Sequence, residues 1–518
     1  MSLSVSMGVS LFLLNYLAMY QTMKHVLLSA MGLGTLGLTT LGVTMGMMTS
    51  CQQPEVKTSI TVDLQAVNQT MDGFGVAEAD WADDVFVFPK REQVLDALFS
   101  ESGLNANILR GEIFPHYSNN PKHLDFALDT DTTMNTVKAA ATLERNDLLR
   151  RGQYWLTSRV QQKYDDVLFT FSVWSPPAWM KEGGHATEMY PASGGKLMKK
   201  HYQSFADYLV SFYKAFDSIG VQTYAVSPSN EPGFAAPWNS CQWSFDEMGD
   251  FIHNYLLPTF KKENVPAKVL FGENPAWSTV FDKLKMISSA DFCNDLLKKY
   301  PLDSERVIAA GHGYVLPDTL PLPADLRRTP ILPFEQPKLR GIHSWVTEIS
   351  DITPLDVSME DGLYWAEMFQ QYLMDAHVNA IVWWCGAMPT KTNESLVILN
   401  NETGDFVLSK RYDAFGNYTR YIAKGSQCVD NQTTGFPGGV VASSFKKDNQ
   451  FTIVVVNRLG VEFPCKLALK DSAMGEVVKS YTTTAETRWQ EAELKASNGE
   501  CIVNVPPMSV VTYTGTVK

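Results

Sequence analysis

Short runs of apolar residues recur along the first four fifths of this 518-residue chain, separated by amphipathic stretches. Most runs end in Gly, polar or aromatic residues, a pattern typical of strands buried on both faces. The clearest amphipathic stretch, residues 201–216, carries six large apolar or aromatic residues at helical spacing. Eight alternations of strand and helix predict an α/β fold with a closed (β/α)8 TIM barrel. The eight predicted strands are 74–76, 106–109, 167–173, 223–226, 268–271, 306–309, 341–345 and 380–384.

The pattern changes near residue 424, where short β-like segments replace the alternation of strand and helix. They are typical of an antiparallel β-sandwich. Residues 59–64 also alternate as a strand does, although they precede the barrel. We therefore expect a barrel over residues 71–423 and an attached β-sandwich domain over 424–518, which a strand at 59–70 completes.

The N-terminal region differs from both predicted domains. Residues 1–50 contain no Asp or Glu and one Lys, and they are rich in Leu, Met, Gly, Thr and Val, as an export segment is. Translation is expected to start at Met23, which is followed by Lys24 and an apolar run. The group ending at Cys51 resembles a bacterial lipoprotein cleavage box, which predicts lipidation of Cys51, a tether over residues 51–58, and a periplasmic or cell-surface location. An ordinary signal peptide or a transmembrane anchor is the alternative.

Net charge and cysteine spacing argue against a nucleic-acid partner and a metal site. The formal net charge is −13, and no run of Lys or Arg offers a site for phosphates, so we expect no nucleic-acid partner. The cysteines show no CxxC or Cys/His spacing, and the sequence therefore predicts no metal site. Cys465 and Cys501 lie in strand-like segments and either pair or stay as buried thiols.

Several carboxylates follow the predicted barrel strands. The active site of such a barrel lies at the carboxyl ends of its strands, so these side chains are candidates for chemistry. Spacing alone does not select a catalytic pair, because each carboxylate could equally cap a helix, neutralise a lysine or face solvent. The candidates are Glu78, Asp80, Glu112, Glu231, Glu273 and Glu348.

The residues around two of these carboxylates are distinctive. Glu231 follows Asn230 in the segment Val-Ser-Pro-Ser-Asn-Glu-Pro after the fourth predicted strand. Glu348 lies in His-Ser-Trp-Val-Thr-Glu-Ile-Ser after the seventh. These two segments resemble the catalytic positions of the large barrel clan of retaining glycosidases.

Further motifs in the correct order resemble glycoside hydrolase family 30 over almost the entire mature chain. They are Met71 to Gly75, Asn107 to Arg110, Ser172 to Lys181, Gly311 to Tyr314, Ile381 to Trp384, and the exit segment Ser409 to Ile422. The resemblance implies a retaining glycosidase that acts by double displacement on two carboxyl groups and needs no cofactor.

The resemblance also implies roles for individual residues. Glu231 is expected to be the general acid/base and Glu348 the nucleophile, with Arg110 beneath it to keep it ionised. Asn230 is expected to bind the sugar 2-hydroxyl, and His312 and Tyr314 to orient the nucleophile or the sugar. Tryptophans near the strand ends are possible platforms for sugar rings, although some must belong to the core. We expect Trp81, Trp174 and Trp384 to contact substrate, whereas Trp238 and Trp243 are weaker candidates. Trp345 also lies near a strand end.

The expected substrate is a neutral β-linked polysaccharide, because several motifs look most like the xylanase-containing branch of the family. Members of that branch specialised for glucuronate-decorated xylan place a basic residue just after the nucleophile. Residues 349–365 contain no Lys or Arg, and their four acidic residues would repel a uronic acid. Xylan or arabinoxylan is therefore expected first. Other branches suggest β-1,6-galactanase, β-1,6-glucanase or glucosylceramidase-like exo-hydrolase activity, and a glycan-binding surface lipoprotein without turnover is a further alternative.

Overall fold

The computed structural model describes residues 56–115, 145–182, 194–236, 238–278, 282–314 and 331–518. The predicted export segment, with Met23 and Cys51, lies outside the described residues. Within the described part of the chain, no helix is both long enough and apolar enough to cross a membrane.

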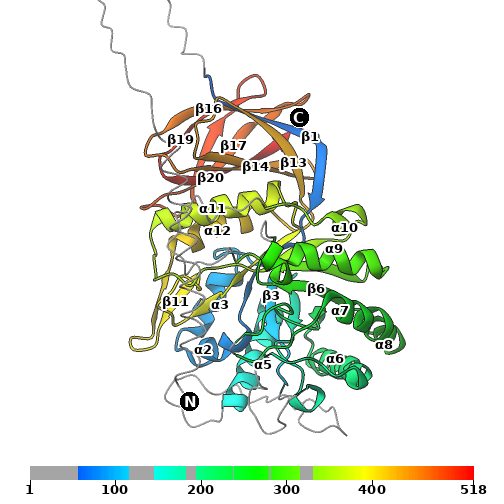
Figure 1. Ribbon diagram of the computed structural model, residues 1–518. Coiled ribbons are helices and arrows are strands. Elements are labelled where there is room, and N and C mark those ends of the chain that lie inside the picture. Colours follow the sequence, from blue (N-terminus) through cyan, green and yellow to red (C-terminus); the bar gives the residue numbers. More distant parts are fainter. Residues whose placement is uncertain (1–55, 116–144, 183–193, 237, 279–281, 315–330) are drawn as a thin grey trace, which may run out of the picture. The chain divides into compact units, whose positions relative to one another are not determined.

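Eight parallel strands close into a barrel in which each strand pairs with its neighbours in sequence, and β9 pairs back to β2 (Figure 1). Each contains one of the eight predicted strand cores or overlaps it, so the predicted TIM barrel is confirmed. The strands are β2 (Gly73–Ala77), β3 (Ile108–Glu112), β4 (Leu168–Ser172), β5 (Thr223–Ser227), β6 (Lys268–Asn274), β7 (Val307–His312), β8 (Ser344–Glu348) and β9 (Ala380–Trp384).

Helices surround the barrel because each buries one apolar face against the outer side of the strands. In α6 (Tyr202–Asp217), the six residues at helical spacing in the sequence are all buried. Serine caps start several of these helices, and Ser244 forms a capping box with Glu247. The others are α2 (Ala82–Val87), α3 (Arg91–Phe99), α5 (Arg145–Lys163), α7 (Phe245–Phe251), α8 (Leu257–Lys262), α9 (Ser289–Lys299), α10 (Glu335–Leu339), α11 (Met359–Met374) and α12 (Lys410–Thr419).

A second, mostly antiparallel sheet of nine strands carries its own apolar core, as the sandwich prediction requires (Figure 1). Its strand order is β18-β17-β20-β15-β14-β13-β1-β16-β19, and only β1 and β16 pair in parallel. The strands are β1 (Ser59–Thr70), β13 (Gln427–Thr434), β14 (Val440–Lys447), β15 (Gln450–Asn457), β16 (Phe463–Leu469), β17 (Met474–Thr483), β18 (Gln490–Lys495), β19 (Cys501–Val505) and β20 (Ser509–Val517). A small three-stranded sheet, β10 (Ala387–Met388), β11 (Val397–Asn400) and β12 (Asp405–Leu408), follows the barrel.

Cys465 and Cys501 do not form a disulfide, and both are buried free thiols. They lie on neighbouring strands but are out of register, because Cys465 is opposite Val503 and Cys501 is opposite Leu467. Of the two alternatives that the sequence left open, the structure therefore has the buried thiols.

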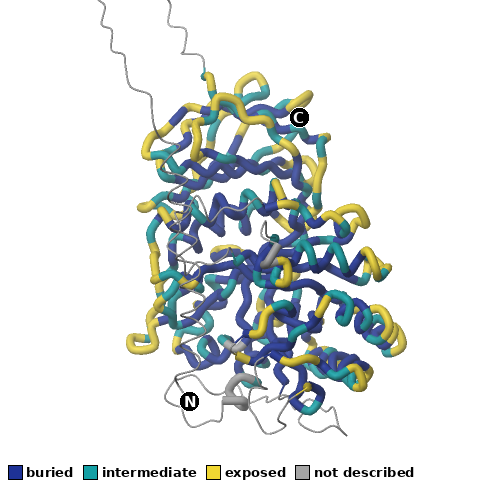
Figure 2. The backbone as a smooth tube through the Cα atoms, viewed as in Figure 1, coloured by how far each residue is buried: buried dark blue, intermediate teal, exposed yellow. Residues whose placement is uncertain are grey.

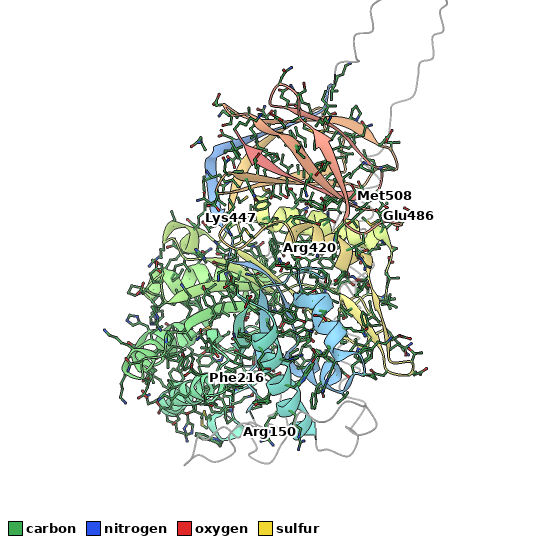
Figure 3. The ribbon with its side chains drawn as sticks, turned by 180° about the vertical axis from the view of Figure 1, so that it is seen from behind. Arg150, Phe216, Arg420, Lys447, Glu486 and Met508 are labelled. Carbon is green, nitrogen blue, oxygen red and sulfur yellow. The ribbon has the colours of Figure 1, made fainter. Side chains whose placement is uncertain are left out.

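The nine-stranded sheet packs against the barrel through α11 and α12, where a continuous buried layer joins the two (Figure 2). Asn417 on α12 donates a hydrogen bond to Tyr481 O at 3.0 Å and accepts one from Thr483 at 2.6 Å. Arg420, labelled in Figure 3, lies over Trp489 with its guanidinium carbon 4.2 Å from a ring centroid. The sheet thus braces the helices that follow the two last strands of the barrel.

Candidate active site

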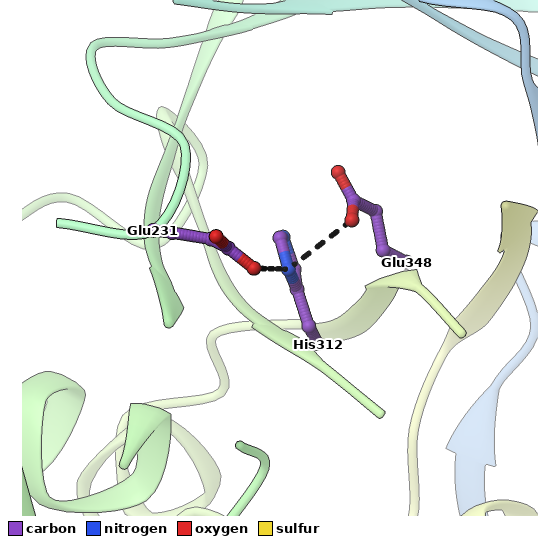
Figure 4. Close-up of side chains that lie close together, drawn as sticks. All are labelled: Glu231, His312 and Glu348. Carbon is purple, nitrogen blue, oxygen red and sulfur yellow. Dashed lines mark ion pairs between the residues drawn. The ribbon is translucent and has the colours of Figure 1, made fainter. Parts of the chain in front are cut away.

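Glu231 and Glu348 lie close together (Figure 4), and both are positioned by the carboxyl ends of barrel strands. Glu348 is the last residue of β8, and Glu231 lies four residues beyond the end of β5. Both side chains are buried. One oxygen of each carboxyl group and a ring nitrogen of His312 all lie within 4.8 Å of one another.

His312, at the end of β7, lies between the two carboxyl groups (Figure 4). Its Nδ1 is 3.3 Å from Glu231 Oε1 and 3.4 Å from Glu348 Oε2. Burial, and then the charge of Arg110, lowers the pKa of His312 well below its usual value. The imidazole is therefore neutral at physiological pH and separates the two carboxyl groups without adding positive charge.

Arg110, near the end of β3, binds three partners at once. Its Nη1 donates a hydrogen bond to Glu348 Oε1 at 2.6 Å, and its Nη2 donates to Asn230 Oδ1 at 2.9 Å and to Glu273 Oε1 at 3.2 Å. Its guanidinium carbon also lies 4.9 Å from the centroid of the Trp174 ring. A bond this short between charged groups in a dry site favours the ionised form of Glu348.

The two carboxyl groups have different electrostatic surroundings. Burial and then the charge of Glu348 raise the pKa of Glu231 well above its ordinary value. Burial also raises the pKa of Glu348, to about 7, but the charge of Arg110 and a hydrogen bond from Tyr314 oppose that rise. Because the hydrogen bonds from Arg110 and Tyr314 go to Glu348, Glu231 is the member of the pair that keeps its proton.

Tyr314 and Asn230 complete the contacts around this pair. The Tyr314 hydroxyl donates a hydrogen bond to Glu348 Oε2 at 2.9 Å. The amide oxygen of Asn230 accepts from Arg110, which fixes the orientation of the amide, so its NH2 group is the end that can donate to a ligand. The Asn230 backbone N–H donates to Val173 O at 2.7 Å and anchors the segment that leads to Glu231.

The sequence offered Glu273 only as one of several carboxylates and did not predict its structural role. Glu273 accepts from Arg110 through Oε1 and from the Ser172 hydroxyl through Oε2, the latter at 2.9 Å. Its backbone oxygen accepts from Glu231 N at 2.9 Å, and Glu231 has a φ of +47°, a conformation that is rare outside glycine. Glu273 thus holds both the guanidinium and the strained backbone of Glu231 in place. The only signal in the sequence was that Glu273 lies near the carboxyl end of a barrel strand, and the other candidate carboxylates lie at such positions too.

The tryptophans that were candidates for sugar platforms differ in how far they are buried. Trp174 and Trp384 lie next to each other, with ring centroids 5.9 Å apart, and Trp81 is half-buried at the start of α2. Trp238 is exposed.

Trp243 and Trp345 belong to the core, as was expected of some of these tryptophans. Trp243 packs against Tyr202 and Phe251 in the helical layer. Trp345 stacks on Tyr224 inside the barrel. Their large apolar rings fill the two cores that a barrel of this size must pack, which the local sequence does not reveal.

Two other candidate carboxylates have different surroundings. Glu78 accepts a hydrogen bond from Ala387 N at 3.0 Å, and burial raises its pKa well above the ordinary value. Glu112 accepts from Asn239 Nδ2 at 3.3 Å, which ties it to the loop after Glu231. Nothing is described of the side chain of Asp80.

Within the described residues, the one group of three or more His, Cys, Asp or Glu side chains spaced as metal ligands is Glu231, His312 and Glu348. A cation there would be repelled by the guanidinium of Arg110, which already donates to Glu348 at 2.6 Å. We therefore interpret the group as a carboxyl pair with a neutral spacer.

The expectation that residues 349–365 present four negative charges to a ligand needs correction. Asp361 is buried and accepts a hydrogen bond from Arg411 Nε at 2.7 Å. Its carboxylate therefore pairs with Arg411 inside the protein and does not face a ligand. Asp351 is also buried, and it caps the following turn by accepting from Thr353 N at 2.8 Å. Only Asp356 and Glu360 are exposed, because the loop uses the other two carboxyl groups to hold its own conformation.

Two curated relatives resemble this chain. A Caenorhabditis elegans protein provisionally named glucosylceramidase 3 is 28% identical over 46% of this chain and 47% of its own length, so the match spans about half of that relative. Glucuronoxylanase XynC of Bacillus subtilis is 24% identical over 69% of this chain and 75% of its own length.

Among solved structures, a family 30 subfamily 8 xylanase from Clostridium acetobutylicum superimposes with a TM-score of 0.65 at 21% identity, covering 88% of this chain and 99% of that one. Residues 71–275 match the glycosyl hydrolase family 30 TIM-barrel domain. The first part of the barrel thus matches family 30, and the fold of the chain is similar to that of a solved xylanase of the same family.

Proposed function

We propose that this chain is a retaining O-glycosyl hydrolase that cleaves a neutral β-linked polysaccharide by double displacement. The single observation that carries the proposal is the approach of Glu231 and Glu348, whose nearest oxygens lie within 4.8 Å. Retaining enzymes hold their carboxyl groups about 5–5.5 Å apart, whereas inverting enzymes need roughly 6.5–9.5 Å to admit a water molecule.

In the first step, a Glu348 oxygen attacks the anomeric carbon while the bond from that carbon to the glycosidic oxygen breaks. Glu231 gives its proton to the departing oxygen, which leaves a covalent glycosyl ester on Glu348. In the second step, Glu231 takes a proton from water, and the resulting hydroxide displaces Glu348 from the anomeric carbon.

The surrounding residues support these two steps. Arg110 and Tyr314 both donate to Glu348, which stabilises its anion before attack and again when it leaves. The amide NH2 of Asn230 is available for the sugar 2-hydroxyl, a contact that strengthens in the transition state. The Trp174–Trp384 pair lies next to Arg110 and is suited to stack on the cleaved sugar.

For the substrate, we propose xylan without glucuronate as the first choice. Lys181 and Lys196, the basic residues that another loop could supply, are both engaged elsewhere. Lys181 Nζ is buried and donates to Ser240 O at 2.6 Å, and Lys196 forms an ion pair with Glu247 at 2.7 Å. Arg411 borders the loop after Glu348 but is buried and paired with Asp361. Lys391 also borders the loop, since its backbone oxygen accepts from Leu355 N, and its side chain is exposed, so it is the basic residue that could contact a uronic acid.

A panel of β-linked glycans with product analysis tests the proposal. It should contain arabinoxylan, xylan with and without glucuronate, β-1,6-glucan, β-1,6-galactan and glucosylceramide. We expect stripped xylan to be cleaved at least as fast as decorated xylan, with a ladder of oligosaccharides if cleavage is internal. A strict requirement for glucuronate would refute the charge argument, and it would direct attention to Lys391. Failure to cleave any member would favour a binding protein without turnover.

We further propose that the protein is exported and anchored through a lipid on Cys51, which rests on the sequence pattern alone. Replacing Cys51 with Ser should move the protein from the membrane fraction to the soluble fraction. Unchanged fractionation would exclude the lipid anchor.

A further inference from the structure

Two aromatic side chains are exposed on the loop that follows Glu231. Trp238 is 50% exposed and Phe234 is 38% exposed. Their ring centroids are 6.3 Å apart and their planes are inclined at 70°. All twelve tryptophans of the chain are described, and Trp238 is the only one that is exposed. Trp238 and Phe234 therefore present two neighbouring aromatic rings to water on the loop that continues from Glu231.

The loop holds Trp238 by fixed contacts on its C-terminal side. The next residue, Asn239, is buried and donates to Glu112 at 3.3 Å. Ser240 is also buried; its carbonyl accepts from Lys181 Nζ at 2.6 Å, and its hydroxyl accepts from Gly194 N at 2.8 Å. An exposed ring on a backbone anchored in this way is presented in a set position and loses little further freedom when it binds a ligand.

The start of the loop is fixed to Glu231 itself. Phe234 N donates to Glu231 O at 2.9 Å, and Trp243 N donates to Pro232 O at 2.9 Å, so the loop closes beside the proposed acid/base. Glu231 protonates the glycosidic oxygen, which joins the cleaved sugar to the leaving group. The loop that continues from Glu231 therefore borders the leaving group, whereas Trp174 and Trp384 lie beside Arg110 and Glu348.

We propose that Phe234 and Trp238 form a platform on which a pyranose ring of the leaving group stacks. This inference rests on the proposed function and adds to it a specific recognition of the departing chain. The flat C–H face of a neutral sugar matches an aromatic face, and the residue next to Phe234 is the small Ala235.

The test compares two substrates that share the cleaved sugar and differ in the leaving group. For xylan these are xylohexaose, whose leaving group is a sugar, and β-xylobiosyl fluoride, whose leaving group has no ring. Trp238→Ala should lower kcat/KM on xylohexaose on the order of tenfold and leave the fluoride within about twofold of wild type. Trp238→Phe, which keeps a ring, should recover most of the loss. Leu339→Ala, a truncation at a side chain that is 73% exposed on α10, is the matched control and should change neither rate.

The other outcomes would overturn either the platform or the proposed xylan hydrolysis. Equal loss on both substrates, or no loss on either, would overturn the platform. A third substrate, octyl β-xylobioside, has a hydrocarbon leaving group; a loss in Trp238→Ala on this substrate without a loss on xylohexaose would overturn the sugar assignment. Failure of the wild-type protein on both xylose substrates would refute xylan hydrolysis itself. The comparison would then be repeated with the sugar that the polysaccharide panel selects. Because Trp238 is exposed, thermal unfolding of the variants should match that of wild type.

Discussion

Tyr314→Phe should shift the pH dependence of catalysis, because Tyr314 donates a single 2.9 Å hydrogen bond to the proposed nucleophile. That bond favours the ionised form of Glu348, whose pKa of about 7 already reflects it. A hydrogen bond to a charged group contributes about 1.5–3 kcal/mol, and one pKa unit corresponds to about 1.36 kcal/mol. Losing the bond should therefore raise the pKa of Glu348 by about one to two units.

The assay is kcat/KM against pH on a substrate with a good leaving group. The acid limb reports ionisation of Glu348 in the free enzyme, so it should move to higher pH by about one to two units in Tyr314→Phe. Tyr213→Phe removes a hydroxyl from a half-buried tyrosine on α6 and serves as the matched control, with no shift expected. An acid limb that stays in place, or one that moves to lower pH, would refute the assignment of Tyr314 as a donor to the nucleophile.

Three other changes test separate parts of the account. Glu348→Gln should abolish turnover on every substrate without unfolding the protein, and substantial residual activity would remove the nucleophile assignment. Glu231→Ala should spare substrates with good leaving groups, and azide should restore deglycosylation; equal loss on good and poor leaving groups would count against the acid role. Glu78→Gln should raise the Tm near pH 7.5 and have little effect near pH 4. Burial raises the folded pKa of Glu78 above its usual 4.5, so its carboxyl group destabilises the fold progressively as the pH rises above that value. The same Tm difference at both pH values would contradict this reasoning.

The barrel could be predicted from sequence because its strands are buried on both faces and appear as uninterrupted apolar runs. Two strands of the nine-stranded sheet that the sequence pattern missed, β13 and β18, are polar. In β18, Gln-Glu-Ala-Glu-Leu-Lys, five of six residues are exposed, and β13 carries a polar end that faces solvent. Such strands form because neighbours supply hydrogen-bonding partners, which is a tertiary effect that local patterning does not contain.

The two proposed catalytic carboxylates could be selected from sequence because distinctive short segments surround them. The family resemblance also suggested Arg110 and Tyr314 as neighbours of Glu348, but it did not suggest Glu273 as the second partner of Arg110. Arg110 joins Glu348 and Glu273, which are separated from it by 238 and 163 positions in the chain. The burial of Asp361 against Arg411 was equally hidden, and the sequence therefore overstated the negative charge that the loop after Glu348 offers to a ligand.

The stereochemistry of the first product tests the central claim most directly. Proton NMR during hydrolysis of the β-linked glycan selected by the panel records the anomer released before mutarotation. With the nearest oxygens of Glu231 and Glu348 within 4.8 Å of each other, the account predicts that the β-anomer appears first and converts slowly to the equilibrium mixture. Initial release of the α-anomer would show inversion, and it would contradict the assignment of Glu348 as a nucleophile.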